Sequence, residues 1–112
     1  MILGYAVHDL LAWGLSIFFV VGAIGNWLGP ANLRAEYARW GYPNWFHRVT
    51  AALEFLIAIF LVFVSTRLGG CALGGVVMLA AIGTLLRHAE YKHALLPTAV
   101  LLLLGLLGFL TI

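Results

Sequence analysis

Residues 47–65 read HRVTAALEFLIAIFLVFVS, an apolar run that a single acidic side chain, Glu54, interrupts. A helix needs about 20 mostly apolar residues to cross roughly 30 Å of hydrocarbon, and this run has that length. In lipid such a run must satisfy its own backbone hydrogen bonds, which favours helices, and the alternation typical of barrel strands is missing. With three further apolar runs, the sequence predicts an all-α polytopic membrane protein, a single domain with a bundle of four transmembrane helices at about 7–28, 47–65, 70–86 and 95–112.

The composition supports a membrane protein. Of the 112 residues, 64% are hydrophobic and only 9% are charged, whereas soluble domains carry about a quarter charged residues. The net charge of +2 comes without a basic run, which argues against nucleic-acid binding. A single cysteine, Cys71, excludes an internal disulfide and a cysteine metal cage. The first apolar run lacks a basic leader and a small-residue cleavage site, so we expect a retained helix.

Small residues at helical spacing predict close packing between the spans, because association in lipid depends on backbones approaching each other. The glycines that share such faces are Gly14, Gly22, Gly25 and Gly29 in the first span and Gly70 and Gly74 in the third. The one long connection, 29–46, also has an apolar helical face, formed by Leu33, Tyr37 and Trp40. Gly41 and Pro43 then provide a stop. We expect a short helix in the membrane interface there, with an irregular loop as the alternative.

The charge distribution predicts an orientation. With four spans, the first and third connections share one side, and that side carries five basic residues: Arg34, Arg39, Arg48, Arg87 and Lys92. The positive-inside rule places these loops in the cytoplasm, in what we expect to be a bacterial inner (plasma) membrane. Aromatic residues gather on the same side, and we assign Trp40, Trp45 and Tyr91, with a snorkelling Arg87, to the membrane interface. His8, on the opposite side, is predicted to be a surface residue.

Glu54 is the most informative residue, because a carboxylate deep in a span must be protonated, paired or exposed to a wet cavity. His47, Thr50 and Glu54 share one helical face, and His88 falls on the inward face of the third span. The residues predicted to converge near the five-charge side are Asn26, His47, Thr50, Glu54, Thr84 and His88. They form either a polar pocket for a quinone headgroup, a lipid headgroup, a proton or a small solute, or a structural contact that fixes helix register. His47 and His88 lack a convincing third ligand, so no metal site is predicted.

These features resemble the DoxX-like family of small four-helix membrane proteins. The matching elements are the glycine-containing end of the first span (22–30), the Gly41-Tyr42-Pro43 loop, Glu54, the Arg67-Leu68 turn and His88. The resemblance implies a membrane partner of an oxidoreductase, as in thiosulfate–quinone and oxidative-stress systems, or a chaperone or cargo receptor. One departure concerns Asn26, which stands where the family often has a lysine. A Glu–Lys ion pair inside the bundle is therefore missing.

Three functions follow as hypotheses. The first is a non-catalytic accessory subunit of a quinone-linked redox complex, associated with other membrane subunits, for which quinone or lipid is the candidate ligand. The second is a small proton-coupled transporter or channel that works as a homo-oligomer around Glu54. The third is a membrane enzyme using His47, Glu54 and His88 for acid–base chemistry. No nucleophile elbow, phosphate loop, zinc-protease signature or dinucleotide fingerprint occurs, so no catalytic residue is assigned.

Overall fold

The computed structural model of the chain describes residues 2–111 and, within them, the side chains of residues 7–111. Five α-helices and one short 3-10 helix follow in the order α1 (Ile2–Leu28), α2 (Ala31–Arg39), α3 (Phe46–Val62), η1 (Val64–Thr66), α4 (Arg67–Arg87) and α5 (Leu95–Thr111). The all-α prediction is confirmed, and each predicted apolar run coincides with one long helix. Helices α1 and α4 begin before the predicted runs, and α3 ends at Val62, before the predicted residue 65. The predicted short helix in the first connection is α2. Ile112, the predicted end of the fourth span, lies outside the described residues.

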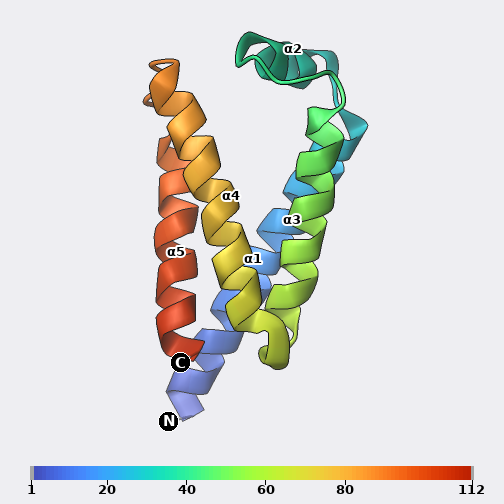
Figure 1. Cartoon of the computed structure of the whole chain (residues 1–112). Coiled ribbons are helices and arrows are strands. Elements are labelled where there is room, and N and C mark those ends of the chain that lie inside the picture. The colour runs from blue at the N-terminus through green and yellow to red at the C-terminus, as the bar shows by residue number, and fades with distance from the viewer. Residues whose placement is uncertain (1, 112) are drawn as a thin grey trace.

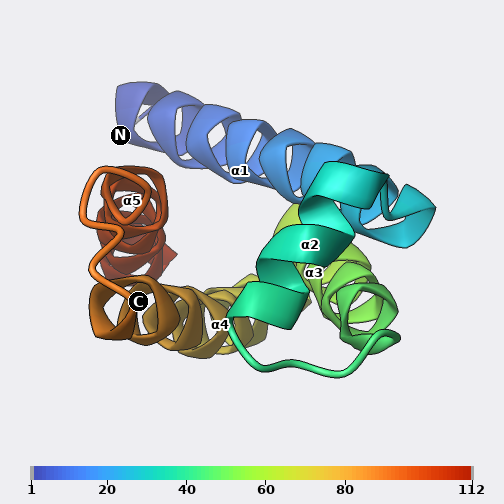
Figure 2. The ribbon, with the colours of Figure 1, turned by 90° about the horizontal axis from the view of Figure 1, so that it is seen from above.

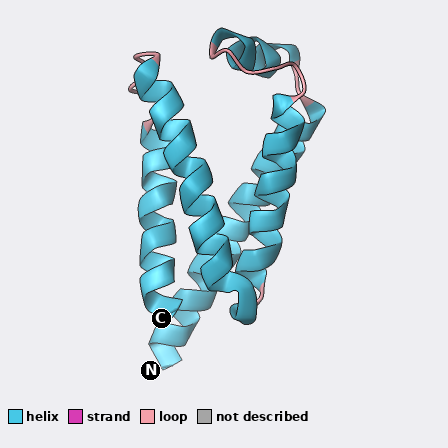
Figure 3. Ribbon diagram, in the orientation of Figure 1, coloured by secondary structure: helices cyan, strands magenta, loops and turns pink. Residues whose placement is uncertain are grey.

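The four long helices follow one axis, and α2 lies across one end of them (Figure 1). Loops occur almost only at the two ends of the bundle (Figure 3). The molecule measures 47 × 25 × 17 Å, and its long dimension is close to the roughly 40–45 Å of a bilayer with its headgroups. Two segments, Val7–Leu28 and Val64–Arg87, are long and apolar enough to cross a membrane. Helices α3 and α5 have 17 residues each, the lower end of the spanning range.

Helices α1 and α3 form one closely packed pair. Ser16 donates a 2.9 Å hydrogen bond to the carbonyl of Ala58, which joins the two helices across their small-residue faces. Of the glycines predicted to pack, Gly22 contacts Glu54, whereas Gly14 and Gly25 face open space. The α1–α3 contact therefore depends on fewer of these glycines than the periodicity suggests.

Helices α4 and α5 form the second pair. A Cβ at Gly74 would lie 3.0 Å from Leu104, so this glycine lets α5 approach the backbone of α4. Viewed from above, the four long helices surround the core in the order α1, α3, α4 and α5, and α2 crosses from α1 toward α4 (Figure 2). The pairs meet in a shared core and diverge toward α2 (Figure 1). The buried core residues are Ala12, Leu15, Phe19, Ile57, Ala58, Leu61, Cys71, Met78, Val100, Leu104 and Leu107.

The end opposite α2 is closed by Arg67, which is only 1% exposed. Helix α3 ends at Val62, and Arg67 opens α4 after the turn formed by η1. Its guanidinium donates to the carbonyls of Leu61 at 2.7 Å and Val62 at 3.0 Å. These carbonyls belong to the last turn of α3, where no intrahelical partner is available. Arg67 therefore caps the helix that precedes it.

Arg67 also joins α4 to α1 and, through His8, to α5. It pairs with the carboxylate of Asp9 at 3.0 Å and lies 3.2 Å from Nδ1 of His8. Nε2 of His8 is 2.9 Å from the hydroxyl of Thr111. The prediction that His8 is a surface residue is wrong, because the side chain is buried in this cluster. We call these four residues (His8, Asp9, Arg67 and Thr111) the arginine clamp.

Candidate functional site

A cavity of about 270 Å³ lies beneath α2, between α3 and α4. Its roof and upper wall are aromatic, with two threonine hydroxyls near the same level, and its lower part is lined by aliphatic side chains. The lining residues are Tyr37, Trp40, Tyr42, Phe46, Thr50, Leu53, Val76, Val77, Ala80, Ala81, Thr84 and Leu85. Two residues of the predicted pocket, Thr50 and Thr84, therefore face the same cavity from α3 and α4.

The aromatic rings of this cavity pack against one another. Tyr42 stacks on Phe46, with ring centroids 4.5 Å apart and planes 10° apart, and Tyr37 meets Trp40 edge-on at 5.5 Å. The hydroxyl of Tyr42 is 2.5 Å from that of Thr84, which attaches the loop after α2 to α4. These contacts hold a rigid aromatic wall and leave hydroxyl groups at its edge.

A chain of hydrogen bonds leads from the roof of the cavity to Glu54. Tyr37 on α2 donates to the amide oxygen of Asn26 on α1 at 2.8 Å. The amide nitrogen of Asn26 donates to Glu54 on α3 at 2.5 Å and to the carbonyl of Gly22 at 3.0 Å. Glu54 is only 6% exposed. Burial raises the pKa of the Tyr37 phenol, against the lowering effect of Thr50, and the phenol stays protonated as a donor.

The hydrogen-bond chain from Tyr37 to Glu54 depends on Gly22. A Cβ at position 22 would overlap Oε2 of Glu54, so any larger residue must displace the carboxyl group. The absence of a side chain lets Glu54 lie directly against α1, next to Asn26. The level of Asn26 and Glu54 was predictable from sequence, but this contact depends on the helix crossing.

Helix α2 is attached to the far side of the bundle by Glu90, in the connection between α4 and α5. Its carboxylate accepts from the indole of Trp40 at 2.6 Å and from Arg39 at 2.8 Å, and lies 3.1 Å from Nδ1 of His93. These donors, the Trp40 N–H above all, lower the pKa of Glu90. We call Glu90 with Trp40 and Arg39 the α2 latch. It holds Trp40 in place in the wall of the cavity.

The two predicted histidines lie away from the cavity. His47 is 7% exposed, packs against Gly29, and its Nδ1 has no hydrogen-bond partner in the described part of the chain. His88 lies on the exposed surface, where Nδ1 is 2.9 Å from the carbonyl of Thr84. Its position follows from the end of α4 at Arg87, because the residue after a helix no longer follows the helical face. Among the described residues no group of three or more His, Cys, Asp or Glu could hold a metal ion.

The predicted interface residues all lie near the α2 end. Trp45 and Tyr91 are 60% and 64% exposed, Arg87 is exposed, and Trp40 is held by the latch. Sequence reasoning left Tyr37 and Tyr42 out of the site, although both belong to the aromatic group noted on this side. The sequence signal for Tyr37 was the apolar face of the short helix, and that for Tyr42 was its place in the Gly41-Tyr42-Pro43 loop.

An all-α bundle of apolar helices with a buried acid is typical of a small helical membrane protein. Residues 10–107 match the model of the DoxX-like family, and the chain belongs to this family. No curated protein and no solved structure matches the chain.

Proposed function

We propose that this chain is an accessory subunit of a quinone-linked redox complex and that the cavity beneath α2 receives a quinone ring. The observation that carries the proposal is the aromatic cavity itself, with its hydroxyl groups at the rim. Pockets for drug-sized ligands measure about 300–1,000 Å³. A cavity of about 270 Å³ suits one ring better than a whole extended ligand.

The chemistry of the lining supports a quinone. A flat ring can stack on the Tyr42–Phe46 pair. The hydroxyl of Thr84 can donate to a ring carbonyl when it accepts from Tyr42, whereas the proton of the Thr50 hydroxyl is donated to the carbonyl of Phe46. The apolar residues of α3 and α4 suit a hydrocarbon tail. The hydrogen-bond chain from Tyr37 through Asn26 to Glu54 places a polar group, the Tyr37 hydroxyl, next to the ring. Only two of the six predicted pocket residues, Thr50 and Thr84, thus line the proposed site, and Asn26 and Glu54 lie behind them. His47 and His88 are left out.

The proposal includes a four-span topology in a bacterial inner membrane. Helices α3 and α5 are short for a span, but each packs antiparallel along a longer helix, α1 or α4 (Figure 1). The α2 end carries the five basic residues, so we place that end in the cytoplasm. Labelling of single cysteines at positions 36 and 64 from either side of the membrane tests this orientation. If a label added from outside reacted at position 36, the orientation would be the opposite of the one proposed.

The binding experiment uses the full chain in mild detergent, titrated with a short-chain ubiquinone while tryptophan fluorescence is followed. We expect quenching that is strongly reduced by Trp40→Phe, because that indole lines the cavity. Ala81→Phe fills the cavity and should weaken binding at least tenfold, whereas Leu79→Phe, at an exposed position outside the cavity, should not. Equal binding by both variants overturns the quinone site. Co-purification with a quinone-reducing enzyme tests the accessory role separately.

The alternative is proton-coupled transport by a homo-oligomer. It is favoured by one observation: within the described residues Glu54 is buried and has an amide, not a cation, as its partner. A carboxyl group without a fixed counter-ion can exchange its proton during a cycle. Proton-driven flux in liposomes should then disappear in Glu54→Gln. Unchanged flux in this variant rules the transporter out.

A further inference from the structure

A second polar hollow lies where the end of α1, the start of α2 and the start of α3 meet. It has a volume of about 490 Å³, and its polar lining comes from Arg34, Asn44, His47 and Arg48. Within the described residues neither arginine has a carboxylate partner within 4 Å, in contrast to Arg39 and Arg67. Two unpaired guanidinium groups at one hollow favour an anion.

His47 supplies an independent sign that the hollow binds a polar ligand. Its side chain is more than nine-tenths buried, it lines the hollow, and its Nδ1 has no hydrogen-bond partner in the described part of the chain. A buried polar nitrogen without a partner is costly. This nitrogen is covered by protein atoms, so an anionic oxygen in the hollow can satisfy it only after the ring turns toward the hollow. The amino-terminal end of α3 adds its partial positive charge.

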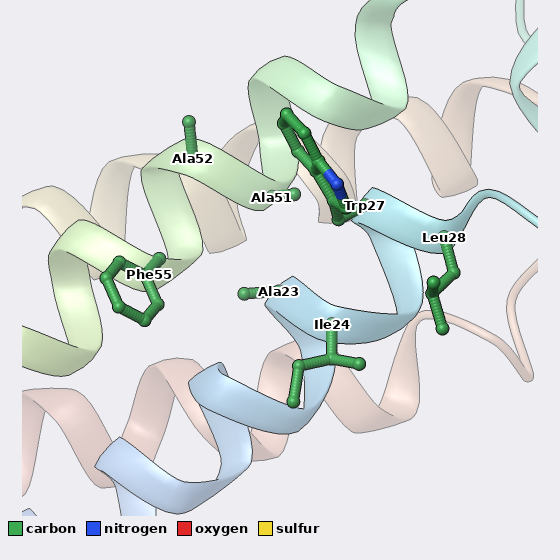
Figure 4. A pocket seen from close by; sticks show the side chains of 7 residues that line it. All are labelled: Ala23, Ile24, Trp27, Leu28, Ala51, Ala52 and Phe55. Carbon is green, nitrogen blue, oxygen red and sulfur yellow. The ribbon is translucent and has the colours of Figure 1, made fainter.

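An apolar groove continues directly from this hollow along the seam of α1 and α3. It measures about 360 Å³, and Leu28 lines both spaces. Figure 4 shows Ala23 and Ala51 on the facing sides of the two helices, with the ring of Trp27 near one end and that of Phe55 near the other. The guanidinium of Arg48 lies 5.1 Å from the Trp27 ring, which connects the charged and apolar parts.

We infer that the hollow and the groove together bind one anionic phospholipid. The phosphate lies between Arg34 and Arg48, within reach of His47, and one acyl chain follows the groove past Ala51. Charge complementarity selects this occupant, because an apolar helix from a partner would leave both arginines unpaired. The site is separate from the cavity beneath α2, which lies on the α4 side of α3.

The experiment measures lipid retained by the full chain after exchange into micelles that contain phosphatidylglycerol, phosphatidylcholine, or inorganic phosphate without lipid. Native mass spectrometry counts bound lipid. We expect one retained phosphatidylglycerol and a preference over phosphatidylcholine of about tenfold or more, since each cation near a lipid surface contributes about fivefold. The double variant Arg34→Gln/Arg48→Gln should lose this preference. Arg87→Gln, which removes an exposed charge at the same end, should keep it.

A second pair of variants tests the groove. Ala52→Trp fills it at an exposed position and should reduce retention severalfold, whereas Leu102→Trp, on the exposed face of α5, should not. A preference for phosphatidylglycerol that survives the double arginine variant overturns the inference. So does full displacement of the lipid by inorganic phosphate together with normal retention in Ala52→Trp, because the hollow would then be a site for free anions. The phospholipid is supported if the double arginine variant loses the preference, Ala52→Trp loses retention, and inorganic phosphate does not displace the lipid.

Discussion

The two ends of the bundle each bury an ionisable side chain, but they do so in opposite ways. At the end formed by η1, Arg67 is surrounded by two backbone carbonyls, Asp9 and His8. At the α2 end, Glu54 has one hydrogen-bond donor, Asn26, among the described residues, and the network that holds it adjoins a cavity. The protein itself supplies the hydrogen-bond partners of the Arg67 guanidinium, whereas the Glu54 carboxyl group can still accept further hydrogen bonds.

The difference teaches how to separate structural from functional polar groups inside a membrane. A buried ion is costly unless its hydrogen-bonding capacity is filled. Where the fold fills it, as in the arginine clamp, the group stabilises the bundle. Where the fold leaves capacity next to an open space, as at the α2 end, ligand binding is the reading that we propose.

The largest effect is expected at the clamp. Arg67→Met leaves the carbonyls of Leu61 and Val62 without a donor and Asp9 without its partner. The free energy of unfolding should fall by about 3 kcal/mol, the lower end for breaking a buried pair, because Asp9 is partly exposed. Thermal unfolding in detergent measures the change. Arg87→Met, at an exposed arginine on the same helix, should stay close to the native protein, and equal stability of both variants would contradict a structural clamp.

The next effect is expected at Gly22. Gly22→Ala places a Cβ on Oε2 of Glu54, so the carboxyl group must move away from Asn26. We expect a loss of about 1–3 kcal/mol, the range for overpacking, measured by the same unfolding assay. Gly25→Ala is the matched control, since nothing lies within 4 Å of its Cβ. Similar losses in both variants would show that helix packing, and not the Glu54 contact, is responsible.

A smaller effect is expected when Asn26 is changed to leucine. This variant removes the acceptor of Tyr37 and the donor to Glu54, and we expect a loss of about 1–2 kcal/mol. Glu54→Gln keeps an oxygen that can accept from Asn26 and should therefore be less destabilising. If Glu54→Gln were the worse variant, the negative charge itself would be stabilising, and the contrast between the two ends would disappear.

The smallest effect concerns the α2 latch and its pH dependence. Because its pKa is lowered, Glu90 contributes to docking of α2 above the ordinary carboxyl pKa, and this contribution is lost as the pH falls through the lowered value. Hydrogen exchange of the α2 amides should therefore accelerate in acid, with global unfolding little changed. Glu90→Gln should show faster exchange already at neutral pH, whereas Glu36→Gln should not. If the α2 amides still exchanged slowly in acid, contacts other than Glu90 would hold α2.

Sequence alone predicted the parts of the fold that depend on apolar length and on local stop signals. The four apolar runs each form one helix, and α2 lies between Gly29 and Gly41 as their turn-forming chemistry suggests. The shared level of Asn26 and Glu54 was also predictable, because depth along a helix follows from residue count. These inferences need no knowledge of how helices cross.

The failures arose where the chain reverses. Helical periodicity was extended to His88, but α4 ends at Arg87 and Ala89 has a φ of 58°, so the predicted inward face does not continue. The clamp was missed because the chain reversal through η1 turns Arg67 back toward Asp9 and His8, a contact between residues about sixty positions apart. No local sequence pattern predicts a contact between residues so far apart in the chain.

Helix α2 is fastened at both ends, covalently to α1 through Gly29 and Pro30, and by Glu90 to the connection beyond α4. Its nine residues measure about 14 Å, so this strut fixes how far the two helix pairs stand apart at their mouth. One added turn would lengthen it by about 5 Å and widen that opening. The length of α2, the shortest α-helix, thus sets the width of the opening between the two helix pairs.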